Sequence, residues 1–215
     1  MKLLYIHAKS KINIDKIINN LDIEGKIGLV STIQYVHQLS ELSKKIPNSI
    51  VCGQILGCNI TKIKNCKDKI DKYLYIGTGE FHPIEIKRKT KKEVYIANPY
   101  TGKIKKLDNS KIQKIKKLEK IAYVTYLKSE KIGLLISTKF GQNKINKAIE
   151  FKKKSKKECY IFLFETLNPE SLEDFKDIEC WINTACPRIA IDDYSKFNKP
   201  IINLNKIKNE KFIEE

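Results

Sequence analysis

The segment KIGLLISTKFGQNKINKAIEFKKKSKKECYIFLF, residues 131–164, decides the fold class of this chain. It begins with the apolar run Lys131 to Ser137 and ends with the apolar run Cys159 to Phe164. Between these runs, residues 142–157 carry a helical pattern with lysines on the outer face. Short, continuous apolar runs are typical of strands that are buried on both faces. A strand, a helix and a second strand in this order predict a βαβ unit of a parallel sheet.

The same alternation of strand and helix patterns extends over the rest of the chain. Further strands are predicted at residues 3–6, 26–31, 49–51, 73–76, 94–97 and 180–183, and a further helix at residues 33–45. After a charged segment that opens with a Pro/Gly turn (residues 99–111), apolar residues recur on one face of a helix at Ile112, Ile115, Leu118, Ile121 and Ala122. We therefore predict an α/β protein with parallel sheets and two domains, residues 1–118 and 119–215.

The composition excludes several classes of protein. Of the 215 residues, 41% are hydrophobic, which is enough to build a core and disfavours a disordered chain. The apolar runs are far shorter than a membrane span, and the N-terminal MKLLYIHAKSK has no small-residue cleavage site. We expect a soluble, cytoplasmic protein with no membrane partner.

The net charge of +17 favours acidic partners, nucleic acid among them. However, only Arg88 and Arg188 are arginines, and abundant lysine also fits an AT-rich coding bias or a heat-adapted surface. Because no nucleic-acid-binding motif accompanies the charge, we expect no specific nucleic-acid partner.

The six cysteines form no CxxC pair, which disfavours a zinc ribbon or a thioredoxin-like motif. Three roles remain for the cysteines: buried thiols, a catalytic thiol, or ligands brought together from distant parts of the chain. Cys58 and Cys186 lie in glycine- or proline-marked loops at the carboxyl ends of predicted strands, where chemistry collects in parallel α/β folds. There a thiolate can reach a metal or a substrate, or the residue can be structural. The other four, Cys52, Cys66, Cys159 and Cys180, are predicted to be core thiols.

Another loop of this kind, GTGEFHP (residues 77–83), lacks the third glycine of a dinucleotide-binding fingerprint. Gly77 and Gly79 either line a site or merely turn the chain. His82, between Phe81 and Pro83, is either a site residue or a structural histidine.

Five motifs together resemble, in the same order, the archaeal diphthamide synthase family, the radical 2-(3-amino-3-carboxypropyl)histidine synthases. They are STIQYVHQL (31–39), GQILGCN (53–59), GTGEFHP (77–83), NPYTG (98–102) and NTACPRIAIDD (183–193). The resemblance runs from about Leu3 to Asn203. It implies Rossmann-like α/β domains around a [4Fe-4S] cluster, three in the family, each of which supplies one cysteine. This chain matches the central and C-terminal domains, and the family's first domain, with its cysteine, is missing.

The resemblance also implies the reaction and the site. In the family, the cluster cleaves S-adenosyl-L-methionine, and the resulting 3-amino-3-carboxypropyl radical adds to a histidine imidazole of elongation factor 2, the first step of diphthamide biosynthesis. Cys58 and Cys186 match the cluster ligands, and no other catalytic residue is assigned. Gly77, Gly79 and His82 are expected to line the S-adenosylmethionine pocket. Arg188 either binds a carboxylate or fixes the loop behind Cys186 through a salt bridge.

Two cysteines are an incomplete ligand set for such a cluster, which is expected to have three protein ligands. We therefore expect a homodimer, or a complex with a homologous chain that supplies the first domain, acting on elongation factor 2. Two alternatives stay open: a non-catalytic partner subunit of a complete homologue, and a truncated or mis-annotated fragment.

Overall fold

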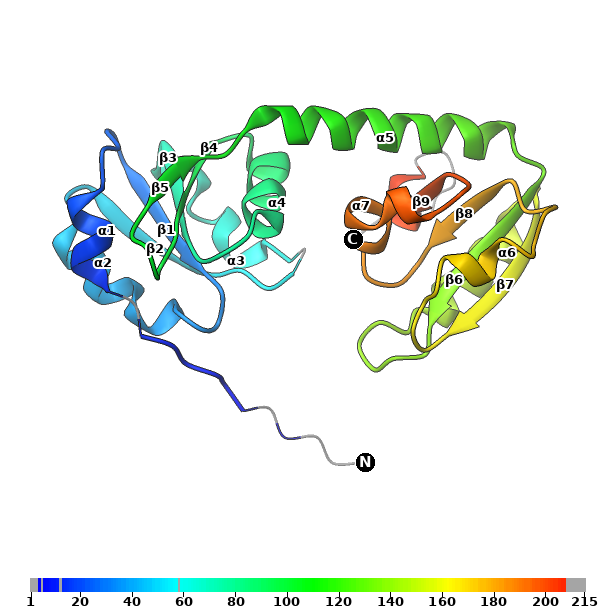
Figure 1. Cartoon of the computed structure of the whole chain (residues 1–215), viewed down its shortest axis with the longest axis horizontal. Helices are drawn as coiled ribbons and strands as arrows, with labels where there is room; N and C mark the ends of the chain where they lie inside the picture. The colour runs from blue at the N-terminus through cyan, green and yellow to red at the C-terminus, as the bar shows by residue number, and fades with distance from the viewer. Residues whose placement is uncertain (1–3, 5, 12, 58, 208–215) are drawn as a thin grey trace. The chain divides into compact units, whose positions relative to one another are not determined.

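A computed structural model describes residues 4, 6–11, 13–57 and 59–207 of the chain. The chain forms two compact units, Met1–Ile112 and Gln113–Glu215, each built on its own sheet (Figure 1). The division lies within the helix α5 (Asn109–Lys128), which also contains the predicted boundary at residue 118. Both sheets are mostly parallel, so the predicted α/β class is confirmed.

The sheet of the first unit has the strand order β2-β1-β3-β4-β5. Its strands are β1 (Ile27–Ser31), β2 (Ser49–Gln54), β3 (Lys72–Ile76), β4 (Glu93–Ala97) and β5 (Ile104–Lys106). All neighbours are parallel except β4 and β5, which are antiparallel. The strand predicted at residues 3–6 is absent at Leu4 and Ile6, which are exposed and in no strand, while Leu3 and Tyr5 lie outside the described residues.

Helices cover both faces of this sheet (Figure 1). On one face α1 (Ile14–Asn19) and α2 (Leu39–Lys45) pack against Leu29 of β1 and Leu74 of β3. On the other face α3 (Thr61–Lys64), α4 (Phe81–Thr90) and the beginning of α5 pack against Val30 and Tyr75. Because successive strand residues point to opposite faces, burial on both faces explains the continuous apolar runs in the sequence.

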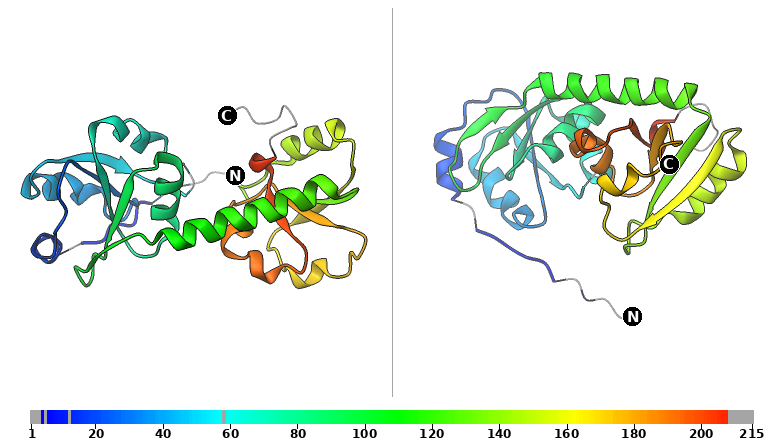
Figure 2. Two further views of the ribbon diagram at one scale, coloured as in Figure 1. Left: turned by 90° about the horizontal axis from the view of Figure 1, so that it is seen from above. Right: turned by 45° about the vertical axis from the view of Figure 1, so that its right-hand side comes forward.

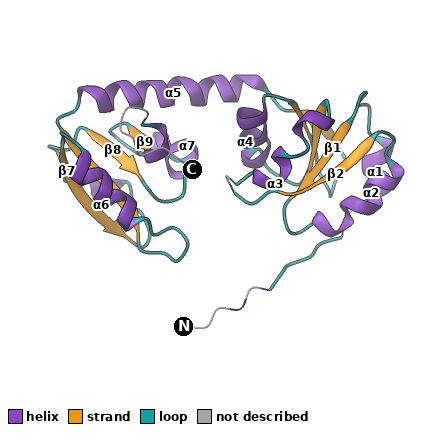
Figure 3. Ribbon diagram, turned by 180° about the vertical axis from the view of Figure 1, so that it is seen from behind, coloured by secondary structure: helices purple, strands orange, loops and turns teal. Residues whose placement is uncertain are grey.

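The second unit has a fully parallel sheet with the order β7-β6-β8-β9. Its strands are β6 (Lys131–Ser137), β7 (Glu158–Phe164), β8 (Cys180–Asn183) and β9 (Ile201–Asn203). The end of α5 and α6 (Ile145–Lys154) cover one face, and α7 (Ile189–Asp192) covers the other, as Figures 2 and 3 show. The strand–helix–strand segment predicted at residues 131–164 is therefore present as β6, α6 and β7.

Short 3-10 helices complete the connections: η1 (Val36–Gln38), η2 (Lys67–Lys69), η3 (Glu170–Leu172), η4 (Tyr194–Lys196) and η5 (Leu204–Lys206). Among the described residues, none of the helices combines the length and the apolar character that a membrane crossing requires.

The parallel strands of both sheets follow the same order, and this order locates the candidate site. In each unit the first strand lies between the second and the third. The chain therefore adds its second strand on one side of the first strand and then crosses over to add the third on the other side. Ligands of open α/β sheets bind where the strand order reverses in this manner, at the carboxyl ends of the two central strands. The two central strands are β1 and β3 in the first unit, and β6 and β8 in the second.

Candidate functional site

The loop 77–80 follows β3 at the reversal point of the first sheet. The Gly77 N–H donates to the Ala97 carbonyl at 3.1 Å, and a Cβ atom at Gly77 would lie 2.5 Å from the Tyr75 hydroxyl. Gly79 has φ +77°, and no atom of the described residues lies within 4 Å of the place where its Cβ would be. Gly77 is therefore required by packing against Tyr75, whereas Gly79 leaves its backbone accessible to a ligand.

His82, in the first turn of α4, is held against Tyr75. Its Nδ1 and the Tyr75 hydroxyl are 3.2 Å apart, and the two rings are stacked with centroids 5.7 Å apart. Burial, followed by the charge of Tyr35, raises the pKa of Tyr75 to about 12. These contacts give His82 a structural role. Its predicted contact with S-adenosylmethionine remains a prediction.

Three further residues at this edge were not predicted as site residues. The Tyr35 hydroxyl donates to the Tyr100 hydroxyl at 3.0 Å, and burial and this contact raise the pKa of Tyr35 to about 12. Thr32 Oγ1 is buried and has no hydrogen-bond partner among the residues that the structure describes. A buried hydroxyl without a partner is costly, and a water molecule or a ligand would satisfy it. All three residues lie within the quoted motifs STIQYVHQL and NPYTG, and this position in the motifs could have identified them as site residues.

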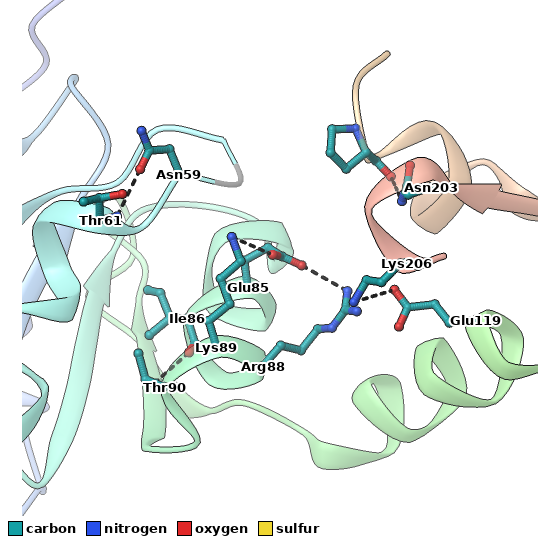
Figure 4. Close-up of polar contacts among 11 residues, drawn as sticks. Asn59, Thr61, Glu85, Ile86, Arg88, Lys89, Thr90, Glu119, Asn203 and Lys206 are labelled. Carbon is teal, nitrogen blue, oxygen red and sulfur yellow. Dashed lines mark hydrogen bonds and ion pairs between the residues drawn. The ribbon is translucent and has the colours of Figure 1, made fainter. Parts of the chain in front are cut away.

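Cys58, one of the two predicted cluster ligands, lies outside the described residues. Its neighbours in the sequence are ordered by two backbone hydrogen bonds between Leu56 and Asn59, of which the shorter, from the Asn59 N–H, measures 2.9 Å. The Asn59 Oδ1 also accepts from the Thr61 N–H at 3.0 Å, which ties this loop to the beginning of α3 (Figure 4).

Cys186, the other predicted ligand, lies in the loop that follows β8 and is half-buried. The buried side chain of Asn183 holds this loop: its Oδ1 accepts from the Ala185 N–H at 3.1 Å, and its Nδ2 donates to the Cys186 carbonyl at 2.9 Å. The Thr184 N–H donates to the carbonyl of Leu135 on β6 at 3.1 Å. The backbone that carries the thiol is therefore fixed on both sides.

A second asparagine, Asn203 at the end of β9, completes this arrangement. The Asn183 Nδ2 donates to the Asn203 Oδ1 at 2.7 Å. The Asn203 Nδ2 in turn donates to the Pro187 carbonyl at 3.1 Å, which is the contact drawn at Asn203 in Figure 4. Both asparagines are buried. Asn203 was not predicted as a site residue, because nothing in its local sequence marks it.

Arg188 forms an ion pair within the same segment. Its Nε lies 2.5 Å from the Asp192 Oδ2, one helical turn further along α7. Of the two interpretations of Arg188, the structure thus supports the salt bridge behind Cys186.

The other cysteines pack in the cores, as predicted. Cys52, Cys159 and Cys180 are buried, and the half-buried Cys66 packs against the core that contains Cys52. Burial, reinforced by the neighbouring Cys66, raises the pKa of the Cys52 thiol, and burial raises that of Cys180 to about 12. Buried, protonated thiols are poor metal ligands. Among the described residues, His, Cys, Asp and Glu form no group of three or more that could hold a metal ion.

The comparisons with known proteins decide the family. The family model described as "Putative diphthamide synthesis protein" matches residues 1–208. The chain belongs to this diphthamide synthesis family. It is 33% identical over 181 residues to the 2-(3-amino-3-carboxypropyl)histidine synthase of Methanocaldococcus jannaschii, a match that covers 82% of this chain and 49% of that protein. The corresponding protein of Pyrococcus horikoshii is 30% identical over 194 residues, covering 82% of this chain and 54% of the relative.

Solved structures of the family have the same fold. The crystal structure of Dph2 from Pyrococcus horikoshii with a 4Fe-4S cluster matches with a TM-score of 0.70 and 26% identity, covering 91% of this chain and 59% of that one. A second structure of Dph2 from this organism gives a TM-score of 0.78 at 23% identity, over 96% of this chain and 65% of that one. The predicted resemblance and the Rossmann-like fold are therefore confirmed, and the chain spans about half the length of the curated relatives.

Proposed function

We propose that this member of the diphthamide synthesis family takes part in the first step of diphthamide biosynthesis. It would transfer the 3-amino-3-carboxypropyl group of S-adenosyl-L-methionine to a histidine imidazole of elongation factor 2. The observation that carries the proposal is the loop of Cys186, which two buried asparagines fix at the reversal point of a parallel sheet. The cluster in the Dph2 structure supports it.

The chemistry of Cys186 fits a cluster ligand. The residue is half-buried, which places it between solvent and core, and its carbonyl is held by Asn183. Iron–sulfur clusters are held by cysteine thiolates, and hydrogen bonds near the sulfur and burial set their potential. In the proposal Cys58 is the second ligand, and the third comes from a second copy or from a homologous chain.

When bound, a [4Fe-4S] cluster with one open iron supplies the electron that cleaves S-adenosylmethionine. The residues of this chain bind the ligands and orient them. Asn183 and Asn203 keep the Cys186 backbone in place, and Gly79 allows a ligand to approach the main chain. Thr32 Oγ1 offers a hydrogen bond that the protein leaves unused among its described residues. We assign Gly77, Gly79 and His82 to the S-adenosylmethionine pocket.

The test is an anaerobic transfer assay. The chain, a longer homologue from the family, elongation factor 2 and a reductant are mixed with S-adenosylmethionine labelled in its carboxylate, and label on the elongation factor is measured. We expect transfer to fall at least about a hundredfold with Cys186→Ala, in line with the loss of a metal ligand or of its support. The half-buried Cys66 provides the matched control, Cys66→Ala, which is expected to retain transfer.

A non-catalytic partner subunit gives a different result. If Cys58→Ala and Cys186→Ala both left complex formation and transfer unchanged, the chain would only bind and stabilise its homologue, and the proposed ligand roles would be wrong. Absence of transfer with every homologous chain would contradict the proposed activity itself.

A further inference from the structure

Among the strands that the structure describes, β7 forms an apolar edge of the second sheet. It lies at the end of the strand order, where β6 is its one neighbour within residues 4, 6–11, 13–57 and 59–207, and Figure 1 shows it in yellow at the outer border of that unit. Parallel sheets are normally covered on both faces. In β7, however, Tyr160 is 40% exposed, Ile161 37% and Leu163 59%.

Natural edge strands are commonly protected by charged residues, prolines or bulges. The edge of the first sheet is protected in this way: the register of β2 shifts by a bulge, and Gly53 in it has φ +100°. In contrast, β7 pairs with β6 in an uninterrupted register over all seven residues, and its sequence ECYIFLF carries a single charge, at Glu158. The edge of β7 is therefore open to another strand.

The hydrogen-bonding phase of β7 determines which residues are available. The Glu158 N–H donates to the Glu130 carbonyl at 2.9 Å, and the Phe164 carbonyl accepts from the Thr138 N–H at 2.8 Å. In a parallel pair, alternate residues direct both backbone groups to the same neighbour. Residues 158, 160, 162 and 164 therefore face β6, and Cys159, Ile161 and Leu163 direct their N–H and carbonyl groups outward.

We propose that β7 is a self-association surface, on which two copies of this chain pair antiparallel about Ile161. In this register Ile161 lies opposite Ile161 of the second copy, and Cys159 lies opposite Leu163. These are the outward-facing residues, so each opposed pair exchanges two hydrogen bonds. The same register covers the exposed Ile161 and Leu163 on one face and brings Tyr160 opposite Phe162 on the other.

The charges that flank β7 also suit a second copy. The residues before the strand, FKKKSKK at 151–157, are basic, and Glu165 follows directly after it. Antiparallel pairing places the basic end of each strand beside the acidic end of the other, whereas parallel pairing would bring the like charges together. This inference rests on the sheet of the second unit alone and does not depend on the proposed function.

The test measures the mass of the full chain in solution by analytical ultracentrifugation over the micromolar range. We expect a dimer whose dissociation constant rises at least about tenfold with Ile161→Pro, because proline removes the outward N–H at the centre of both strands. As that variant also risks misfolding, Leu163→Lys tests the same surface through a side chain that is already exposed. Leu127→Lys, at a 48% exposed leucine of α5, is the matched control and is expected to remain dimeric.

Disulfide crosslinking tests whether the two copies pair in this register and along the edge of β7. Antiparallel pairing about Ile161 brings the two copies of this residue to a Cα separation of about 5.5 Å, so Ile161→Cys should form a covalent dimer on mild oxidation. Ile50→Cys lies on β2, the edge strand of the first sheet that the bulge protects, and should not form a covalent dimer. A wild-type chain that is monomeric over the whole range would overturn the inference, as would a dimer unaffected by both Ile161→Pro and Leu163→Lys.

Discussion

The side-chain amide of Asn183 donates to the Oδ1 of Asn203 across 2.7 Å, and this contact joins the ends of β8 and β9 beneath the loop of Cys186. Each amide also holds a carbonyl of that loop: Asn183 binds that of Cys186 and Asn203 that of Pro187. A proposed metal ligand thus stands on a backbone whose position is set by two buried side chains twenty residues apart. Supporting residues of this kind commonly decide how well a metal ligand is oriented.

Removing the second asparagine should loosen the loop. Asn203→Ala leaves a donor of Asn183 and the Pro187 carbonyl without their partners, and we expect it to cost about 1–3 kcal/mol of unfolding free energy. It should also change the rate at which iodoacetamide alkylates Cys186 in the metal-free chain, measured by peptide mass spectrometry. Asn198→Ala, at an exposed asparagine, is the control. Equal stability and equal alkylation in the two variants would show that the contact does not support the loop.

Close packing of β6 against β8 should make Gly133 sensitive to substitution. A Cβ atom at this position would lie 2.2 Å from Cζ3 of the fully buried Trp181. Gly133→Ala therefore overpacks the core, and we expect it to lower the unfolding free energy by about 1–3 kcal/mol. Trp181 is the single tryptophan of the chain, so its fluorescence follows unfolding of this unit directly. Unchanged stability would mean that Trp181 packs differently.

Alkaline pH should destabilise the first unit. The pKa values of Tyr35 and Tyr75 are raised to about 12 in the folded chain, from an ordinary value of about 10, chiefly by burial. The folded state holds these protons more tightly than the unfolded state, so the stabilisation is fully present below pH 10 and is lost as the pH rises through about 12. Tyrosinate absorbance during a pH titration measures the ionisation of these tyrosines, and circular dichroism measures the loss of the fold.

The contrary result of that titration is also clear. If all ten tyrosines ionised together near their ordinary pKa while circular dichroism stayed native, the two hydroxyls would not be buried as described.

The ion pair of Arg188 should contribute little to stability. The arginine side chain is 54% exposed, and exposed pairs one helical turn apart contribute about 0.3–0.5 kcal/mol. Arg188→Ala and Asp192→Ala are therefore expected to unfold at nearly the same denaturant concentration as the wild type. If Arg188→Ala alone also weakened binding of S-adenosylmethionine, measured by calorimetry, the carboxylate-binding interpretation would be restored.

Much of the fold was predictable because burial leaves a simple mark on the sequence. The strands at residues 131–137 and 159–164 and the helix between them were found from continuous apolar runs and a helical lysine face. Short strands without such runs were missed: β5 has the sequence IKK and β9 has three residues. The apolar run at residues 3–6 was misleading, because Leu4 and Ile6 pair with no strand and lie exposed.

The candidate site was predictable only where residue type and loop position coincide. Cys186 and Gly79 were found because each follows a central strand within a few residues. Asn203 and Tyr100 act through contacts with residues twenty and sixty-five positions away, and no local pattern announces such partners. Tertiary hydrogen bonds therefore mark the limit of what a single sequence discloses about this site.

The measurement that tests the central claim most directly is the iron and sulfide content of the chain, with EPR spectra after dithionite reduction. The protein is reconstituted without oxygen, together with a longer homologue from the family. The proposed ligands predict a reduced [4Fe-4S] signal beyond that of the homologue alone, which is lost with Cys58→Ala or Cys186→Ala and kept with Cys66→Ala. A cluster signal that survives both ligand substitutions, or no added cluster with any homologous chain, would contradict the account.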